Sequence, residues 1–244
     1  MLNESPELAV GWLTDVINQV LKARIEHEQR KMQVDRVYRR PEGTTGKTQS
    51  VITAEPQATD ILLTGGTGFL GPFLLLSILQ QTNNKIYVLV RGDDREQAER
   101  RLRREFISTV GHDASVHCFD ERVNILCGEL SRQHFGLSHA EWDHLLSNIG
   151  SIYHNGAMVN YLLDYEHMRP TTVAGTAHVI DLAFSGKRKI LNYISTTFIF
   201  GWAAKDVLYE TDQNSSMDHL DFGYSQTKWV AEQLVLSAMD QGLD

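Results

Sequence analysis

Ile61-Leu62-Leu63-Thr64-Gly65-Gly66-Thr67-Gly68-Phe69-Leu70-Gly71 is the stretch that decides the fold. A short apolar run, typical of a buried strand, leads into a glycine-rich turn and then into an apolar helix. In such a turn Gly65 allows a tight bend, Gly68 a close backbone approach to a pyrophosphate, and Gly71 close helix–sheet packing. A glycine-rich turn that binds nothing is the alternative, but the strand–loop–helix context favours dinucleotide binding. The candidate cofactor-binding residues here are Gly65, Thr67, Gly68, Phe69, Leu70 and Gly71.

After Asp60, short apolar runs alternate with longer amphipathic stretches, a pattern typical of βαβ units. The sequence therefore predicts an α/β fold with a Rossmann-like, doubly wound parallel sheet. The predicted strands are 61–64, 85–90, 123–127, 151–154 and 189–195. The predicted helices are 70–81, 95–108, 139–147, 171–185 and 224–239.

The N-terminal part differs in character from the rest of the chain. Ser5 as N-cap, Pro6 in the first turn and an apolar stripe at helical spacing predict an amphipathic helix over residues 1–34. Residues 35–58 are polar, contain prolines and glycines, and are interpreted as a linker, followed by the dinucleotide-binding domain over 59–244. The helix either packs on the main domain or pairs with another copy, or it contacts an upstream carrier or partner domain. Both interpretations stay open.

Composition narrows the function. The net charge is −8 and the basic residues form no long stripe, so a nucleic-acid partner is not expected. No apolar run is long enough to span a membrane, and we expect a cytoplasmic protein without a membrane partner. The only two cysteines are Cys118 and Cys127, which indicates a reduced chain without a disulfide scaffold. The histidines lack metal-ligand spacing, so no metal site is predicted.

The ends of the next predicted strands supply further cofactor candidates. Arg91 follows the second strand. A carboxylate at this position would bind the ribose diol of NAD, whereas the guanidinium of an arginine suits a 2′-phosphate. Arg91 therefore favours NADPH. Arg101 is either a second cation for that phosphate or an ordinary surface arginine. Glu129 and Leu130 follow the third strand and are expected near the adenine. Asn155, Gly156 and Ala157 end the fourth strand beside the cofactor.

The candidate catalytic residues are Thr196, Tyr224 and Lys228. Tyr224 and Lys228 are four positions apart, so they share a helix face on which the cation can lower the pKa of the phenol. Both are also expected to contact the cofactor. Thr196 follows the fifth strand, where a hydroxyl would face the nicotinamide and the substrate carbonyl. The alternative interpretation is that Tyr224 and Lys228 are surface residues of an amphipathic helix that have this spacing by chance.

These motifs together resemble the extended short-chain dehydrogenase/reductases. Within that group the chain looks most similar to the thioester reductase domains of nonribosomal peptide synthetases, polyketide synthases and carboxylic acid reductases. The closer resemblance is carried by Tyr87-Val88-Leu89-Val90-Arg91, Tyr153-His154-Asn155-Gly156-Ala157-Met158-Val159-Asn160 and Gly223-Tyr224-Ser225-Gln226-Thr227-Lys228-Trp229-Val230-Ala231-Glu232, and also by Gly128-Glu129-Leu130, Phe135-Gly136-Leu137-Ser138 and Gly175-Thr176. Two departures are Thr172, where such domains usually carry asparagine, and Glu129, where aspartate is more usual.

The resemblance implies NADPH as cofactor and a substrate held as a thioester on the phosphopantetheine of an acyl or peptidyl carrier protein. It implies reductive release of an aldehyde, which some relatives reduce again to an alcohol. It also implies a C-terminal substrate cap, which we expect to be absent from this chain. Two alternatives remain: another extended reductase or epimerase acting on a ketone, sterol or nucleotide sugar, and a non-catalytic NADPH-binding fragment.

Overall fold

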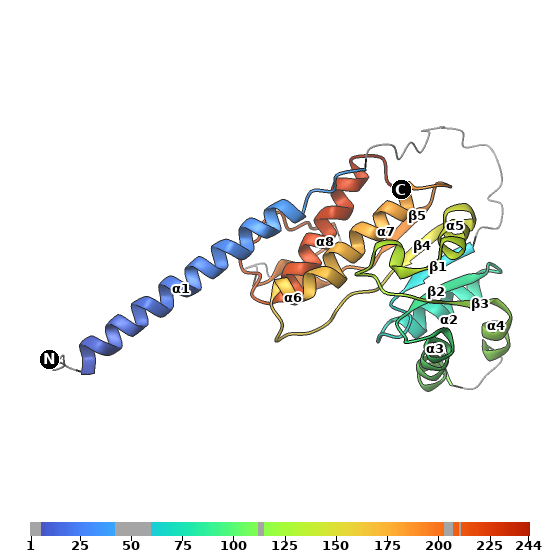
Figure 1. The fold of residues 1–244 in the computed structure, drawn as a ribbon, viewed down its shortest axis with the longest axis horizontal. Helices are drawn as coiled ribbons and strands as arrows, with labels where there is room; N and C mark the ends of the chain where they lie inside the picture. Colours follow the sequence, from blue (N-terminus) through green and yellow to red (C-terminus); the bar gives the residue numbers. More distant parts are fainter. Residues whose placement is uncertain (1–5, 42–59, 112–114, 203–206, 210) are drawn as a thin grey trace.

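A five-stranded parallel sheet forms the centre of the computed structural model, which describes residues 6–41, 60–111, 115–202, 207–209 and 211–244 (Figure 1). Its strands are β1 (Asp60–Thr64), β2 (Ile86–Val90), β3 (Val123–Cys127), β4 (Ile149–His154) and β5 (Ile190–Tyr193). Their order is β3-β2-β1-β4-β5, and every neighbouring pair is parallel. This confirms the predicted Rossmann-like α/β fold. Most of the stretch predicted as a linker lies outside the described residues.

Alternating strand residues divide the core into two apolar clusters, one on each face of the sheet. On β1, Ile61 and Leu63 join one cluster and Leu62 joins the other. The first cluster is covered by α2 (Gly71–Gln81), α3 (Arg95–Val110) and α4 (Ser115–Arg122). The second is covered by α5 (His139–Asn148), α6 (Tyr165–Arg169), α7 (Gly175–Phe184) and α8 (Gly223–Met239). Because both faces are buried, the strands are apolar runs, which explains why the sequence pattern identified them.

Two segments differ from the sequence-based expectation. The helix predicted over 171–185 begins earlier and is not regular: α6 is followed by a π-helical turn at Pro170–Ala174 and then by α7. Proline has no N–H for a regular helical bond, and Thr176 donates its hydroxyl to the Thr172 carbonyl at 2.6 Å, so side chains take part in the bonding here. The helix α4 was not predicted. It is short, and it is held at its end by Arg122, which donates to the carbonyls of Leu79 and Asn84.

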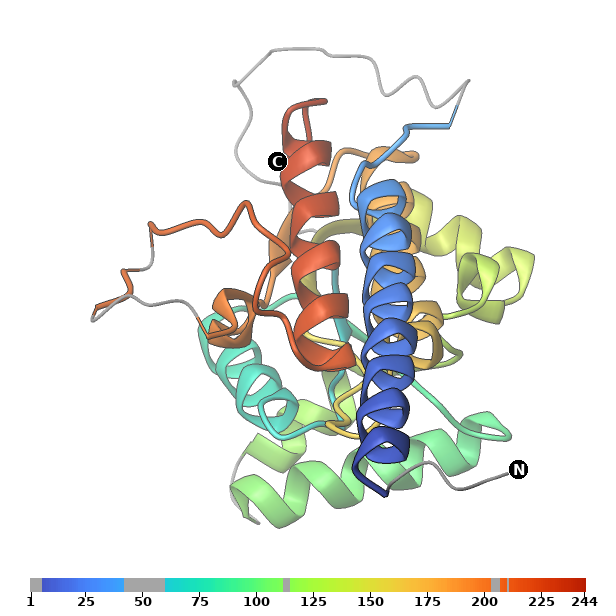
Figure 2. The same ribbon diagram turned by 90° about the vertical axis from the view of Figure 1, so that its left-hand side faces the viewer.

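The N-terminal helix α1 (Pro6–Asp35) lies beside α8 at its C-terminal end, while its N-terminal half projects beyond the domain (Figures 1 and 2). Met32 is buried, and the Asp35 carboxylate accepts hydrogen bonds from Arg169 at 2.5 and 2.6 Å and from Tyr165 at 2.7 Å. Tyr38, in the stretch predicted as a linker, is buried and donates to Asp181 at 2.6 Å. The apolar residues Ile17, Val20, Leu21 and Ile25 along this helix are exposed.

Strand β5 forms one edge of the sheet. It pairs with β4 on one side, and on its other side the Leu191 amide donates to the Asp244 carbonyl at 2.9 Å. Ile190 at the start of this strand is 55% exposed.

The Asp35 carboxylate is expected to hold α1 against the domain. Burial alone would raise the pKa of Asp35, but the bonds from Arg169 and Tyr165 outweigh it and lower the pKa. Asp35→Asn removes a charged acceptor of three hydrogen bonds and should lower the free energy of unfolding by about 2 kcal/mol. Chemical denaturation measures this, with Asp15→Asn on the exposed part of the same helix as the control. Equal stability of the two variants would show that α1 is not held by this contact.

Candidate active site

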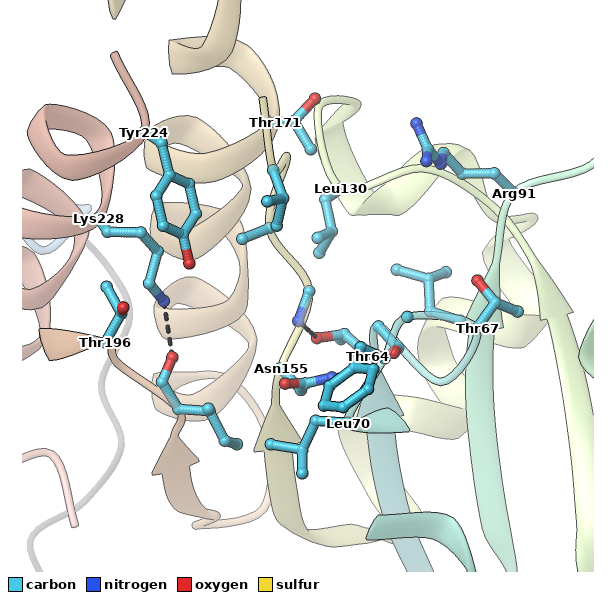
Figure 3. Close-up of a pocket in the computed structure, with 18 of the residues that line it drawn as sticks. Thr64, Thr67, Leu70, Arg91, Leu130, Asn155, Thr171, Thr196, Tyr224 and Lys228 are labelled. Carbon is cyan, nitrogen blue, oxygen red and sulfur yellow. Dashed lines mark hydrogen bonds between the residues drawn. The ribbon is translucent and has the colours of Figure 1, made fainter. Parts of the chain in front are cut away.

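A cavity of about 380 Å³ opens at the carboxyl ends of the strands, where β1 and β4 lie side by side and the strand order reverses. Most of the predicted site residues line it, from both halves of the sheet (Figure 3). Those that line it are Gly65, Thr67, Gly68, Phe69, Leu70, Arg91, Arg101, Leu130, Asn155, Gly156, Ala157, Thr196, Tyr224 and Lys228. Gly71 is buried behind the loop, and Glu129 lines a neighbouring cavity.

The glycine loop has the shape that the sequence requires. Gly65 has a φ of +72°, a backbone conformation that side chains other than glycine's rarely adopt. A Cβ on Gly71 would lie 2.3 Å from the Gly65 carbonyl oxygen, so only glycine lets the start of α2 approach the loop this closely. A Cβ on Gly68 would meet only the Gly65 oxygen, at 3.4 Å, so the backbone there is open to the cavity. The loop therefore fits a phosphate group at the N-terminus of α2.

The turn after β4 packs directly on this loop. The Asn155 side chain donates to the Gly65 carbonyl at 3.1 Å, and the Gly156 amide donates to the Thr64 hydroxyl at 3.0 Å (Figure 3). Thr64 was not among the predicted site residues, although it is the last residue of the strand before the glycines and lines the cavity. The two turns form one wall of the cavity.

Two arginines stand at the β2 side of the cavity. Arg91 and Arg101 both line it, and Arg101 donates to the Arg91 carbonyl at 3.3 Å. Both also line the neighbouring cavity of about 530 Å³, together with Arg132. Arg132 lies 3.4 Å from the Glu129 carboxylate and was not identified from the sequence. These cations provide a binding place for an anionic group next to the glycine loop.

Tyr224 and Thr196 face each other across the opposite end of the cavity (Figure 3). Burial raises the pKa of the Tyr224 phenol, Tyr161 raises it further, and a hydrogen bond from Thr196 offsets part of the increase. The net direction is opposite to the expected lowering by Lys228, because the loss of hydration is the largest effect. Tyr224 is therefore protonated at neutral pH and able to donate a proton.

Lys228 is almost completely buried one helical turn after Tyr224. Its Nζ donates to the Ile194 carbonyl at 2.6 Å and lies 4.2 Å from the centre of the Tyr193 ring (Figure 3). Burial lowers the pKa of Lys228 to about 8, and the nearby Glu232 opposes this shift. An ammonium has three donors, so one directed at Ile194 leaves capacity for a ligand in the cavity.

Aromatic rings pack against the ring of Tyr224. The rings of Tyr161 and Phe198 contact it edge to face, with centroids 5.8 and 5.9 Å away, and Phe222 contacts both of them. Sequence reasoning missed these residues because they come from three separate segments, and no local motif links them. They restrict the orientation of the phenol.

No cluster of histidine, cysteine and acidic side chains suited to a metal ion occurs among the residues that the structure describes. Within the same residues, every helix is too short or too polar to cross a bilayer.

Comparison with known proteins agrees with this geometry. Residues 63–244 match the NAD-binding family described as Male sterility protein. The chain belongs to this family. It is 37% identical over 186 residues to a subunit of linear gramicidin synthase from Brevibacillus parabrevis, covering 75% of this chain and 4% of that protein. It is 31% identical over 233 residues to the L-2-aminoadipate reductase large subunit of Penicillium chrysogenum, covering 89% of this chain and 16% of that protein.

Among solved structures, the terminal R domain of the myxalamid PKS-NRPS biosynthetic pathway superposes with a TM-score of 0.77 at 35% identity. The match covers 87% of this chain and 53% of that one, so the chain spans about half the length of this reductase domain. The resemblance to the thioester reductase domains of the extended short-chain dehydrogenase/reductases is thereby confirmed. The family also confirms a nicotinamide dinucleotide as cofactor.

The burial of Lys228 predicts a pH dependence of dinucleotide binding. The ammonium is the form that can donate to a ligand, so affinity should fall as the pH rises through about 8, the lowered pKa of this lysine. We expect a decrease between about pH 7 and 9 for NADPH and NADH in fluorescence titrations. The Lys228→Met variant should bind both dinucleotides more weakly, and its affinity should change little over this pH range. If the affinity of this variant still fell with rising pH, the titration would belong to another group.

Proposed function

We propose that this chain is the cofactor-binding part of an NADPH-dependent reductase that releases an acyl or peptidyl chain from a phosphopantetheine thioester. The observation that carries the proposal is the cavity in which the glycine loop, two arginines, Thr196, Tyr224 and Lys228 come together. The product is an aldehyde, which can be reduced again to an alcohol. An acyl or peptidyl carrier protein presents the thioester, and the reaction takes place in the cytoplasm.

The choice of NADPH rests on charge at the β2 end of the cavity. In dinucleotide sites the residue after this strand contacts the adenosine ribose, where a carboxylate suits the free 2′-hydroxyl and an arginine suits a 2′-phosphate. Arg91 occupies this position, and Arg101 adds a second guanidinium from α3. Both line the same anion-accepting region, which supports a role for both.

The residues at the other end account for proton transfer. When bound, NADPH supplies a hydride to the substrate carbonyl. The hydroxyls of Thr196 and Tyr224, which both line the cavity, stabilise the developing oxyanion, and the phenol of Tyr224 donates its proton. Collapse of the resulting hemithioacetal frees the thiol. Lys228, whose ammonium donates to the Ile194 carbonyl, would hold the nicotinamide ribose with its remaining donors.

The thioester substrate is supported by the relatives. One lies in a gramicidin synthase, another is an aminoadipate reductase, and a solved thiolation-reductase di-domain from an archaeal nonribosomal peptide synthetase, 20% identical, has the same fold. A carrier-bound substrate also fits a cavity that is open toward solvent at Phe69, whose side chain is 92% exposed.

Arg91→Ala and Arg101→Ala should each weaken NADPH binding by roughly tenfold and leave NADH binding nearly unchanged, because only NADPH carries the 2′-phosphate. Fluorescence titration with both dinucleotides measures this. Arg100→Ala, on the exposed surface of the same helix, is the control. Equal losses for NADPH and NADH would assign the arginines a structural role instead.

Tyr224→Phe should reduce thioester turnover by about 10²–10⁴ while NADPH binding is retained, because the phenol proton is lost but the ring and its packing remain. The assay follows NADPH consumption with an acyl-pantetheine thioester, in this chain and in the longest native polypeptide that contains it. Tyr209→Phe, at an exposed tyrosine, is the matched control. An unchanged rate would exclude the proposed role of Tyr224, and turnover of a ketone or nucleotide sugar in place of the thioester would favour the other extended reductases.

A further inference from the structure

His154, the last residue of β4, is a fully buried polar side chain that the proposed mechanism does not use. Its Nδ1 lies 2.7 Å from the Thr64 hydroxyl at the end of β1, and its Nε2 lies 3.0 Å from the Thr176 hydroxyl on α7. The imidazole thus joins the strand that enters the glycine loop to a helix on the second face of the sheet. In the sequence His154 belongs to the stretch 153–160 that carries the resemblance to thioester reductase domains, and no individual role is predicted for it.

The hydrogen-bond partners fix the position of the imidazole proton. The Thr176 hydroxyl donates its proton to the Thr172 carbonyl at 2.6 Å, since a carbonyl can only accept. Thr176 must then accept from His154, which places the proton on Nε2. Nδ1 is left as an acceptor and receives the proton of the Thr64 hydroxyl.

This arrangement in turn determines what the Thr64 hydroxyl can do for the cofactor loops. Because its single proton points to His154, its lone pairs are available to the Gly156 amide, which donates to it at 3.0 Å. The chain of bonds runs from Gly156 through Thr64 and His154 to Thr176 and Thr172. Each group in it has the partner that its chemistry requires.

This series of hydrogen bonds ends at the contact between the two turns of the dinucleotide cavity. A Cβ added to Gly65 would come within 2.7 Å of the Asn155 and Gly156 backbone, and one added to Gly156 would come within 2.9 Å of the Thr64 hydroxyl oxygen. The two turns therefore pack against each other and against Thr64 with no room for an additional carbon atom.

We propose that His154 is a positioning residue for the dinucleotide site, which as a neutral imidazole protonated at Nε2 orients the Thr64 hydroxyl and thereby sets the spacing of the Gly65 and Gly156 turns. The inference rests on the proposed cofactor site. It assigns to His154 no contact with the cofactor or the substrate.

The surroundings of His154 keep the imidazole neutral. Burial, and in addition the positive charge of Lys228, lower the pKa of His154 to about 3. The ring of Tyr193 lies beside it, with centroids 5.7 Å apart. The direction of the bonds therefore stays the same throughout the neutral pH range.

The tautomer can be tested without any ligand. A long-range ¹H–¹⁵N spectrum of the histidine-labelled chain at neutral pH should show His154 with a pyrrole-type Nε2 and a pyridine-type Nδ1, the resonances being assigned by their loss in His154→Gln. A proton on Nδ1, or an imidazolium, would overturn the proposal whether or not the chain binds a dinucleotide.

A matched pair of variants tests the effect on binding. Thr64→Val and Thr176→Val each remove one buried hydroxyl that contacts the same imidazole, so both should lower the melting temperature. Of the two, only Thr64 contacts the cavity turns directly, so NADPH affinity should fall roughly tenfold in Thr64→Val, equivalent to about 1.4 kcal/mol. It should fall by a smaller factor in Thr176→Val, which acts on the turns only through the imidazole. Equal effects of the two variants on affinity would overturn the positioning role.

Replacements of His154 itself separate the two ends of the network. Asparagine can place an amide near the Nδ1 position and glutamine near the Nε2 position. His154→Asn should therefore retain more NADPH affinity than His154→Gln at similar stability, and the reverse order would contradict the proposal. If the unsubstituted chain bound neither NADPH nor NADH while showing the expected tautomer, the cofactor assignment would fail and the role in binding with it. Binding by the unsubstituted chain with no difference among the variants would remove this inference alone.

Discussion

The parallel pairing of β1 with β4 is the constraint on which the rest of the site depends. The register places Leu63 opposite Tyr153 and Thr64 opposite His154, so the two strands end together. Because the chain crosses to opposite sides of the sheet after these strands, their turns diverge and leave a cavity between them. The hydroxyl of Thr64 and the imidazole of His154 meet because they are register partners. A shift of one strand by one residue would separate them and turn one of the two side chains toward the other face of the sheet.

The cavity separates two kinds of positive charge. Arg91 and Arg101 lie at an open end, where guanidinium groups are hydrated and suit a phosphate that brings its own charge. Lys228 lies at the closed end, where a carbonyl and an aromatic face replace part of its lost hydration. The open end can therefore select a ligand by charge, whereas the closed end acts through a group whose protonation responds to small changes in its surroundings.

The sequence was sufficient where function depends on neighbouring residues. The glycine loop, Arg91, and the spacing of Tyr224 and Lys228 are local patterns, and the structure places all of them around one cavity. Features built from distant segments were not predictable in this way. The rings around Tyr224 come from three segments, and the role of His154 depends on partners 90 and 22 residues away. The expected lowering of the Tyr224 pKa was wrong because spacing shows the neighbouring charge but not the extent of burial.

The edge of the sheet at β5 has a consequence for what can pair with the sheet. Within the residues that the structure describes, this strand pairs with β4 alone, and a main-chain bond from Leu191 to Asp244 covers only one position on its outer side. A strand edge with unpaired amides and carbonyls can accept a strand from another molecule, and the half-exposed Ile190 adds an apolar contact there. The outer edge of β5, at the end of the sheet opposite to β3, is therefore a place where this fold can accept a further strand.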